Sequence, residues 1–259
     1  MVLKFAANLN FLFTEAATIA ERIHLAHRAG FRAVEIPFPR SQEEQVVQAK
    51  NETGVQIALM NIALGPDDMA LGSTSLPGAE EHFRNHLNET VTLAKQLQCK
   101  KIHLMAGLVK TSNRDDHLKT YQSNLKYAVD ILEKENIVGV IEPINKYSVP
   151  GYFMNCYDVA RSVLQSVNSR HLRLMLDIFH LQLIRGNITN SFQDFADLIG
   201  HIQIAQVPNR HEPDHEGELN YAYVFSLIEK LGYNDWIGCE YKPKTNTQEG
   251  LQWLKKYQA

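Results

Sequence analysis

Short apolar runs rich in β-branched residues alternate with amphipathic stretches along the whole chain. Eight of these runs predict strands, at residues 3–9, 33–38, 55–62, 100–106, 138–144, 172–178, 201–207 and 236–242. Segments of helical periodicity precede or follow the runs. Strands that alternate with helices predict βαβ units and therefore a parallel sheet.

Two of the helical segments show apolar residues at a spacing of three and four. The first contains Phe83, Leu87, Val91, Leu93, Ala94 and Leu97, and the second contains Leu118, Tyr121, Leu125, Ala128, Val129 and Leu132. Closer to the N-terminus, we expect the first helix to begin at Thr14 or Glu15 and to end at Gly30. Hydroxyl and acidic residues favour helix starts, and glycine favours helix ends.

The number of units predicts how the sheet closes. The 259 residues divide into eight units of about 32 residues, and a (β/α)8 barrel typically takes about 250 residues. A doubly wound open sheet competes, but it usually carries a glycine-rich phosphate loop after its first strand. The segment AANLNFLF at 6–13 has no glycine. We therefore predict an α/β fold, with residues 1–259 forming a single (β/α)8 TIM barrel domain.

Composition indicates the class of protein and the compartment in which we expect it. Hydrophobic residues make up 44% of the chain and charged residues 21%, with a formal net charge of −3. These values are typical of a soluble globular protein without a general attraction for nucleic acid. No apolar run is long enough for a membrane span, and the N-terminus does not resemble a signal peptide. Cys99, Cys156 and Cys239 are far apart, which indicates reduced thiols and a cytoplasmic location.

The longest turn-rich connection, ALGPDDMALGSTSLPGAEE at 63–81, follows the third predicted strand. Loops after barrel strands form the face that carries active sites. Long loops in compact domains are often functional. We expect this segment to be a candidate lid.

Polar residues interrupt four successive strands near their carboxyl ends. They are Glu142, Asp177, Gln203 and Glu240, separated by 35, 26 and 37 residues, about one βα unit each. Three carboxylates converging without a nearby lysine or arginine would repel one another unless a divalent cation lay between them. Their hard oxygens, with that of Gln203, suit Mg²⁺ or Mn²⁺. The alternative is that one or two of them are ordinary carboxylates at strand ends.

Three further side chains are candidates for contact with a substrate. His180 follows Asp177 by three residues, just past the strand, and could reach a substrate oxygen. His103 lies in the middle of its predicted strand, where a hydrogen-bonded structural role competes with a role at the site. Glu35, among Val34, Ile36 and other apolar residues, needs a partner if it is buried. We expect it to line the pocket.

The loop at 207–221, VPNRHEPDHEGELNY, follows the seventh predicted strand and is rich in charge. It would place Arg210 within reach of the site. Arginine is well shaped to hold a carboxylate through two hydrogen bonds, so Arg210 is the candidate anion clamp. The alternatives are that Arg210 is solvated and that Lys242, or backbone amides, bind the acid. The aromatic residues Phe11, Phe13, Phe38 and Phe179 are assigned no chemistry.

At these residues the chain resembles the hydroxypyruvate isomerase family, which has a xylose isomerase-like barrel. The resemblance rests on segments from both ends of the chain: FAANLNFLFTE, SLPG, DIFH, GNIT, HIQIAQVPNRHEP, GELNY and GCEYKP. It implies that Glu142 and Glu240 are the proton-transfer pair. It also implies a metal site at Glu142, Asp177, Gln203 and Glu240. The segments ALGPDDMALGSTS and NKYSVPGYFMN match loosely, which leaves the substrate less well defined than the reaction.

The expected activity is an aldose–ketose type isomerisation of a small hydroxy-keto acid. Hydroxypyruvate would become 2-hydroxy-3-oxopropanoate (tartronate semialdehyde) by proton transfer through an enediolate. A ketose 3-epimerase is the first alternative. A zinc endonuclease would need more histidines and a basic surface, and a barrel that only binds ligands has no reason to keep repelling carboxylates. No nucleic-acid or membrane partner is expected, and a homo-oligomer stays open.

Overall fold

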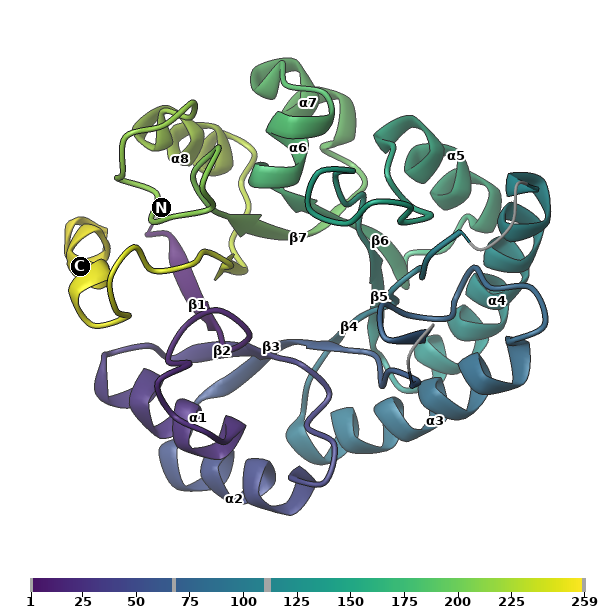
Figure 1. The fold of residues 1–259 in the computed structure, drawn as a ribbon, viewed down its shortest axis with the longest axis horizontal. Coiled ribbons are helices and arrows are strands. Elements are labelled where there is room, and N and C mark those ends of the chain that lie inside the picture. The colour runs from purple at the N-terminus through teal and green to yellow at the C-terminus, as the bar shows by residue number, and fades with distance from the viewer. Residues whose placement is uncertain (1, 67–68, 110–112, 258–259) are drawn as a thin grey trace.

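The computed structural model describes residues 2–66, 69–109 and 113–257. Within these ranges, eight parallel strands form one closed barrel in chain order, which confirms the predicted fold (Figure 1). The strands are β1 (Lys4–Asn8), β2 (Ala33–Ile36), β3 (Gln56–Asn61), β4 (Lys101–His103), β5 (Val138–Ile141), β6 (Leu172–Asp177), β7 (Ile199–Ile204) and β8 (Trp236–Cys239). The barrel closes where residues 4–7 pair with residues 236–239.

Helices surround the barrel as an outer ring (Figure 1). They are α1 (Ile19–Arg28), α2 (Glu43–Thr53), α3 (Glu80–Leu97), α4 (Arg114–Lys134), α5 (Tyr157–Val167), α6 (Ile178–Ile184), α7 (Ile188–Phe195), α8 (Tyr221–Lys230) and the 3₁₀ helix η2 (Glu249–Lys256). The apolar faces predicted for α3 and α4 are buried in the core, except Leu118, which is partly buried. None of the helices in the described residues combines the length and the apolar character needed to cross a membrane.

The predicted start of the first helix is wrong. Helix α1 begins at Ile19, where Thr18 Oγ1 accepts the backbone N–H of Glu21 at 3.2 Å and Glu21 Oε2 accepts that of Thr18 at 3.0 Å. This reciprocal capping box satisfies two amide groups at the helix start. The predicted end is confirmed, because the helix stops at Arg28 and Gly30 follows with φ of +96°.

The strands end slightly earlier than the apolar pattern suggests. Strand β5 ends at Ile141 and β8 at Cys239, so Glu142 and Glu240 are the first residues beyond their strands. His103 is the last residue of β4, which corrects its predicted place in the middle of a strand. All three residues therefore lie at the carboxyl end of the barrel, the face that carries active sites in this fold.

Part of the candidate lid is packed into the body of the protein; residues 67–68 lie outside the described residues. The backbone N–H of Ser75 donates to Ala106 O at 2.8 Å, and Thr74 Oγ1 donates to Met105 O at 2.8 Å. Gly72 has φ of +103°, and a Cβ there would lie 2.1 Å from Met105 O. Residues 72–75 are therefore fixed to the β4–α4 connection, and the lid prediction stays untested for the rest of the segment.

Candidate active site

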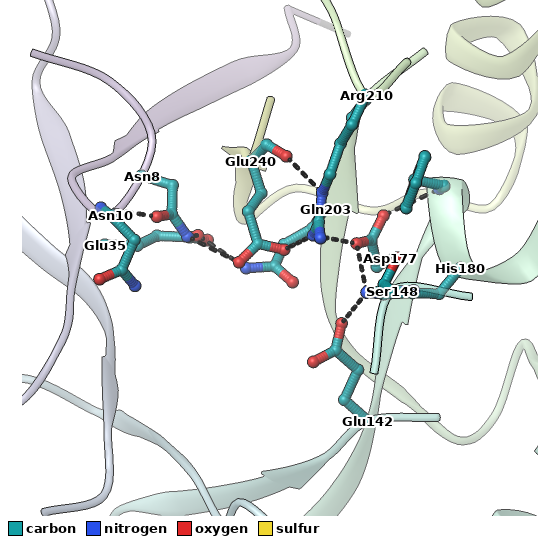
Figure 2. A network of polar contacts seen from close by, with 12 residues as sticks. Asn8, Asn10, Glu35, Glu142, Ser148, Asp177, His180, Gln203, Arg210 and Glu240 are labelled. Carbon is teal, nitrogen blue, oxygen red and sulfur yellow. Dashed lines mark hydrogen bonds and ion pairs between the residues drawn. The ribbon is translucent and has the colours of Figure 1, made fainter. Parts of the chain in front are cut away.

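The four polar residues predicted from strands 5 to 8 meet at the carboxyl end of the barrel (Figure 2). Asp177 is the last residue of β6, and Gln203 is its register partner in β7. Glu142 and Glu240 follow β5 and β8. Glu142, Asp177 and Gln203 are buried, and the side chain of Glu240 is 15% exposed. The four side chains reach the same end of the barrel because each lies at, near or just beyond the carboxyl end of its strand.

Arg210 lies among these carboxylates, so a cation of the protein itself opposes the repulsion for which the sequence analysis invoked a metal ion. Its Nη2 group donates to Asp177 Oδ2 at 3.0 Å and to Glu240 Oε2 at 2.5 Å, and its Nε donates to the backbone oxygen of Glu240 at 3.2 Å. The predicted anion clamp therefore already holds two carboxylates of the protein. These two carboxylates raise the pKa of Arg210 despite its burial.

The position of Arg210 depends on features that have no periodic signal in the sequence. Its guanidinium carbon lies 4.7 Å from the ring centre of Phe11 and 4.8 Å from that of Phe179. Its backbone has φ of +58°, a sparsely populated region for a residue other than glycine. The backbone N–H of Lys242 donates to Arg210 O at 2.7 Å. Phe11 and Phe179, which the sequence analysis assigned no chemistry, thus orient the cation.

His180 presents a proton to the carboxylates. Its Nδ1 accepts the backbone N–H of Asn145 at 3.2 Å, so in the neutral ring Nε2 carries the hydrogen. That Nε2 lies 3.5 Å from Asp177 Oδ2 and 3.7 Å from Glu142 Oε1. Burial lowers the pKa of His180 to about 4, so the imidazole is a neutral donor at physiological pH.

His103 approaches the same carboxyl group from β4. Its Nε2 lies 3.7 Å from Glu142 Oε2, and burial lowers the pKa of His103 to about 3. His103 and His180 therefore lie beside the two oxygens of Glu142, at distances longer than a hydrogen bond, and both rings are neutral. The predicted contact of each histidine with a substrate stays a prediction.

The two glutamates differ from ordinary carboxyl groups. Burial, together with the negative charges of Glu240 and Asp177, raises the pKa of Glu142 well above its usual value. Burial raises the pKa of Glu240 to about 8, although Arg210 opposes this increase. In the protein without a bound cation, Arg210 lies against Glu240 and favours its ionised form, whereas the histidine rings beside Glu142 are neutral. Such a pair can supply one acid and one base at the same pH.

Glu35 lies inside the barrel with both oxygens engaged. Its Oε2 accepts from Asn8 Nδ2 and from Gln203 Nε2, both at 2.8 Å, and its Oε1 contacts His201 Nε2. The partner that a buried acid requires is therefore supplied by protein groups. Its predicted lining role is not tested by this geometry, but its oxygens face the barrel interior rather than an open pocket.

The donor set fits a divalent cation. Glu142 Oε1 and Gln203 Oε1 are buried oxygens without a hydrogen-bond partner. Among the residues that the structure describes, the one group of at least three His, Cys, Asp or Glu side chains that could hold a metal ion is Glu142, Asp177 and His180, whose ligand atoms lie within 4.8 Å of one another. For His180, however, the amide hydrogen bond to Nδ1 leaves a proton on Nε2. The unpartnered oxygen of Gln203 is therefore a better cation ligand than His180, together with Glu142, Asp177 and Glu240.

Three residues of the site escaped the sequence analysis: Asn8, Asn145 and His201. Asn8 is the last residue of β1 and His201 lies within β7, so both are polar residues in apolar strands. The rule that selected Asp177, a polar residue at the carboxyl end of an apolar strand, could have found Asn8, whereas His201 lies in the middle of its strand. Asn145 lies in a loop, and no periodicity marks it.

Comparisons with known proteins agree with this fold. The family model described as "Xylose isomerase-like TIM barrel" matches residues 23–257. A crystal structure from Brucella melitensis, titled an AP endonuclease of family 2, superposes with a TM-score of 0.93 at 35% identity and covers 100% of both chains. The class of the protein is therefore that of the xylose isomerase-like TIM barrels.

Curated relatives narrow this class. A Drosophila melanogaster protein named putative hydroxypyruvate isomerase is 54% identical, covering 99% of this chain and 98% of its own length. Escherichia coli hydroxypyruvate isomerase is 38% identical, covering 99% and 100%. The 2-oxo-tetronate isomerase of Cupriavidus necator is 39% identical and covers 98% of each. The chain belongs to the hydroxypyruvate isomerase family, and its enzyme class is that of an isomerase.

Proposed function

We propose that the protein interconverts hydroxypyruvate and 2-hydroxy-3-oxopropanoate. The observation that carries this proposal is the pair of carboxyl groups of Glu142, which is buried, and Glu240, which is partly buried; they reach the carboxyl end of the barrel from two different strands. The similarity to relatives named for this reaction supports the choice of substrate.

The reaction moves one proton between adjacent carbon atoms. Glu240, whose ionised form is stabilised by the neighbouring Arg210, removes a proton from C3 of hydroxypyruvate. The resulting enediolate carries its negative charge on oxygen, where the Nε2–H of His180 can donate a hydrogen bond. Glu142 delivers a proton to C2, and the hydroxyl proton passes from O3 to O2. No net oxidation occurs, and the aldehyde forms at C3.

The proposal includes a divalent metal ion, Mg²⁺ or Mn²⁺. Glu142, Asp177, Gln203 and Glu240 would hold it, because all four offer oxygen and two of those oxygens have no other partner. When bound, the cation supplies Lewis-acid stabilisation of negative charge on a substrate oxygen.

The substrate carboxylate requires a cationic partner. We retain Arg210 for this role through its Nη1 group, which makes none of the contacts with Asp177 and Glu240. Because Nη2 is already engaged, the clamp would be weaker than a two-bond arginine–carboxylate pair. Lys242 is the competing group.

A second candidate substrate is a 2-oxo acid with one more carbon atom. The 39% identical relative from Cupriavidus necator is named for 2-oxo-tetronate, and the same pair of glutamates would serve this reaction. A ketose 3-epimerase remains an alternative with the same chemistry. The metal group found in the described residues contains one histidine, which does not favour the several zinc ions of an endonuclease.

The proposed location is the cytoplasm. The three cysteines are free thiols, as expected for a reducing compartment. Burial raises the pKa of Cys99 to about 12, so this thiol is unreactive.

Product analysis in D₂O tests the function directly. The purified protein is incubated with hydroxypyruvate, 2-oxo-tetronate or a panel of ketoses, with added Mn²⁺ or with a chelator, and the products are followed by NMR. We expect 2-hydroxy-3-oxopropanoate with deuterium at C2. Conversion of ketoses but not of hydroxypyruvate would show an epimerase. Complete transfer to C2 of the hydrogen that leaves C3, without deuterium from the solvent, would contradict the two-glutamate mechanism.

A further inference from the structure

A chain of polar contacts crosses the barrel from its amino end towards the candidate active site. At the amino end, Lys101 Nζ donates to Asp235 Oδ2 at 2.7 Å and lies 3.3 Å from His201 Nδ1. His201 Nε2 then contacts Glu35 Oε1. Apolar side chains normally fill a barrel interior, so a continuous polar chain there needs an explanation.

The direction of each hydrogen bond in this chain follows from its donors. An ammonium group can only donate, so Nδ1 of His201 accepts from Lys101. The neutral ring then carries its hydrogen on Nε2 and donates it to Glu35. A proton on Nδ1 would face the ammonium group of Lys101 at 3.3 Å, so the ring stays neutral. Lys101 therefore selects the tautomer that binds Glu35.

Glu35 in turn determines the orientation of two side-chain amides. Its Oε2 accepts from Asn8 Nδ2 and Gln203 Nε2. With the NH₂ group of Gln203 committed to Glu35, the oxygen of that amide is left buried and unpartnered. Asn8 Nδ2 also lies 3.3 Å from Glu240 Oε1, so the same orientation presents a donor to Glu240.

Strand β8, which β1 separates from β2, leaves room for the Glu35 side chain at Gly238. A Cβ atom at Gly238 in β8 would lie 2.0 Å from Glu35 Oε1. Because Oε1 is the oxygen that His201 contacts, any larger residue at 238 would displace that contact. The glycine is thus required by the position of the Glu35 carboxyl group.

We propose that Glu35, held by His201 and Lys101, is a positioning residue that orients the amides of Gln203 and Asn8 towards the site. Gln203 consequently presents its oxygen to a cation, and Asn8 presents a hydrogen-bond donor to Glu240. The effect on turnover rests on the proposed function, whereas the effect on amide orientation does not.

The first test exchanges the carboxyl group at position 35 and the amide group at position 203. In Glu35→Gln, the new NH₂ group faces either the Nε2–H of His201 or the NH₂ groups of Asn8 and Gln203, so the directed chain of hydrogen bonds that holds the amide at 203 is broken in both arrangements. We expect Mn²⁺ affinity to fall at least tenfold and kcat to fall at least tenfold, with KM changing less than threefold. The double variant Glu35→Gln/Gln203→Glu restores a donor–acceptor pair with an oxygen facing the site. It should recover most of the Mn²⁺ affinity.

Two outcomes would overturn the proposal in this test. One is a folded Glu35→Gln variant with wild-type kcat and Mn²⁺ affinity. The other is a folded exchange variant that recovers neither quantity. Thermal unfolding is measured for both proteins, because a barrel-interior substitution can also lower stability.

The second test acts from the opposite face of the barrel and does not alter Glu35. Lys101→Met frees His201 to adopt its other tautomer. We expect a change in the ¹⁵N signals of the His201 ring and a threefold to tenfold fall in kcat. Lys100→Met is the matched control, because Lys100 is the exposed preceding lysine. Wild-type His201 signals and wild-type kcat in Lys101→Met would contradict the proposal even if Glu35→Gln failed to fold.

The two proposals fail in different ways. If the wild-type protein does not convert hydroxypyruvate, the proposed function is wrong. The ring signals of His201 in Lys101→Met and the side-chain amide signals of Gln203 in Glu35→Gln still decide the positioning role.

Discussion

Arg210 shows how strongly a single residue can depend on its neighbours. It lies between Asp177 and Glu240, and its side chain is only 13% exposed. Breaking a buried ion pair by removing one partner typically costs about 3–5 kcal/mol, because the remaining charge stays buried. Arg210 therefore affects the ionisation of the carboxylates in addition to its proposed contact with the substrate.

Replacing either proton-transfer residue should remove activity without unfolding the protein. Glu142→Gln and Glu240→Gln keep the shape of the side chain but cannot accept a proton. General acid–base groups contribute about 10²- to 10⁴-fold in rate, so kcat should fall at least that far. His180→Ala should be milder, because His180 only donates to a substrate oxygen. NMR assays of conversion measure the rates, and a variant of either glutamate with more than a tenth of wild-type kcat would contradict the assignment.

The raised pKa of Glu142 predicts a pH-dependent effect on stability. Because the folded state holds this proton more tightly than the unfolded state, the group stabilises the fold below about pH 4.5 and loses that contribution as the pH rises towards the folded pKa. Glu142→Gln removes the buried charge. In the presence of a chelator, its Tm should exceed that of the wild type by an amount that grows from pH 5 to pH 8. A Tm difference that is independent of pH would count against the raised pKa.

Arg210→Lys tests the link between Arg210 and Glu240. A lysine ammonium lacks the second nitrogen with which Arg210 also binds the backbone oxygen of Glu240, so its charge is held less firmly against the Glu240 carboxylate and opposes the raised pKa of Glu240 less. Because the base must be ionised, the rising limb of kcat/KM against pH should move to higher pH. Lys242→Ala is the control and should keep the wild-type profile. If the Lys242 variant alone lost kcat/KM for hydroxypyruvate, Lys242 would be the carboxylate-binding group.

Among the helices and strands, α1 shows how local hydrogen bonds select one of two similar start signals. Thr14 and Thr18 are both plausible capping residues, but only Thr18 has a glutamate three positions later. Glu15 instead accepts the backbone N–H of Thr247 at 2.9 Å. The C-terminal part of the chain thus holds residue 15 outside the helix.

This difference predicts unequal effects of two threonine substitutions. Thr18→Ala removes the side-chain cap and should lower the free energy of unfolding by about 1 kcal/mol. Thr14→Ala, at an exposed position before the helix, should change it by less than about 0.5 kcal/mol. Urea denaturation of the two variants measures both values. Equal losses would show that the capping box does not determine the helix start.

At the scale of the whole molecule, a cation that binds the folded barrel must stabilise it by mass action. At 100 times its Kd, the gain is about 2.7 kcal/mol, and each kcal/mol raises Tm by roughly 2–4 °C for a domain of this size. We expect Mn²⁺ to raise Tm by about 5–10 °C and a chelator to reverse the shift. Gln203→Ala should reduce the shift, whereas His180→Ala should keep it. The opposite pattern would identify Glu142, Asp177 and His180 as the ligand set.

The order of strands and helices and the placement of the main polar residues can be predicted from the residue pattern. Alternating strand and helix periods repeat through the chain, and each repeat is a local property that needs no knowledge of distant contacts. Since parallel strands in a barrel share one carboxyl end, the spacing of Glu142, Asp177, Gln203 and Glu240 was enough to bring them to one face. The family resemblance agreed with this result.

The charge and the orientation of these residues depend on contacts between segments that are distant in the sequence. Glu35 and His201 are 166 positions apart, and Arg210 reaches Asp177 from a loop without periodicity. The tautomers of His180 and His201, the orientation of the Gln203 amide and the counter-charge of Glu240 all follow from such contacts. Hydrogen-bond direction and burial depend on which atoms meet in space, and residue spacing along the chain does not contain that information.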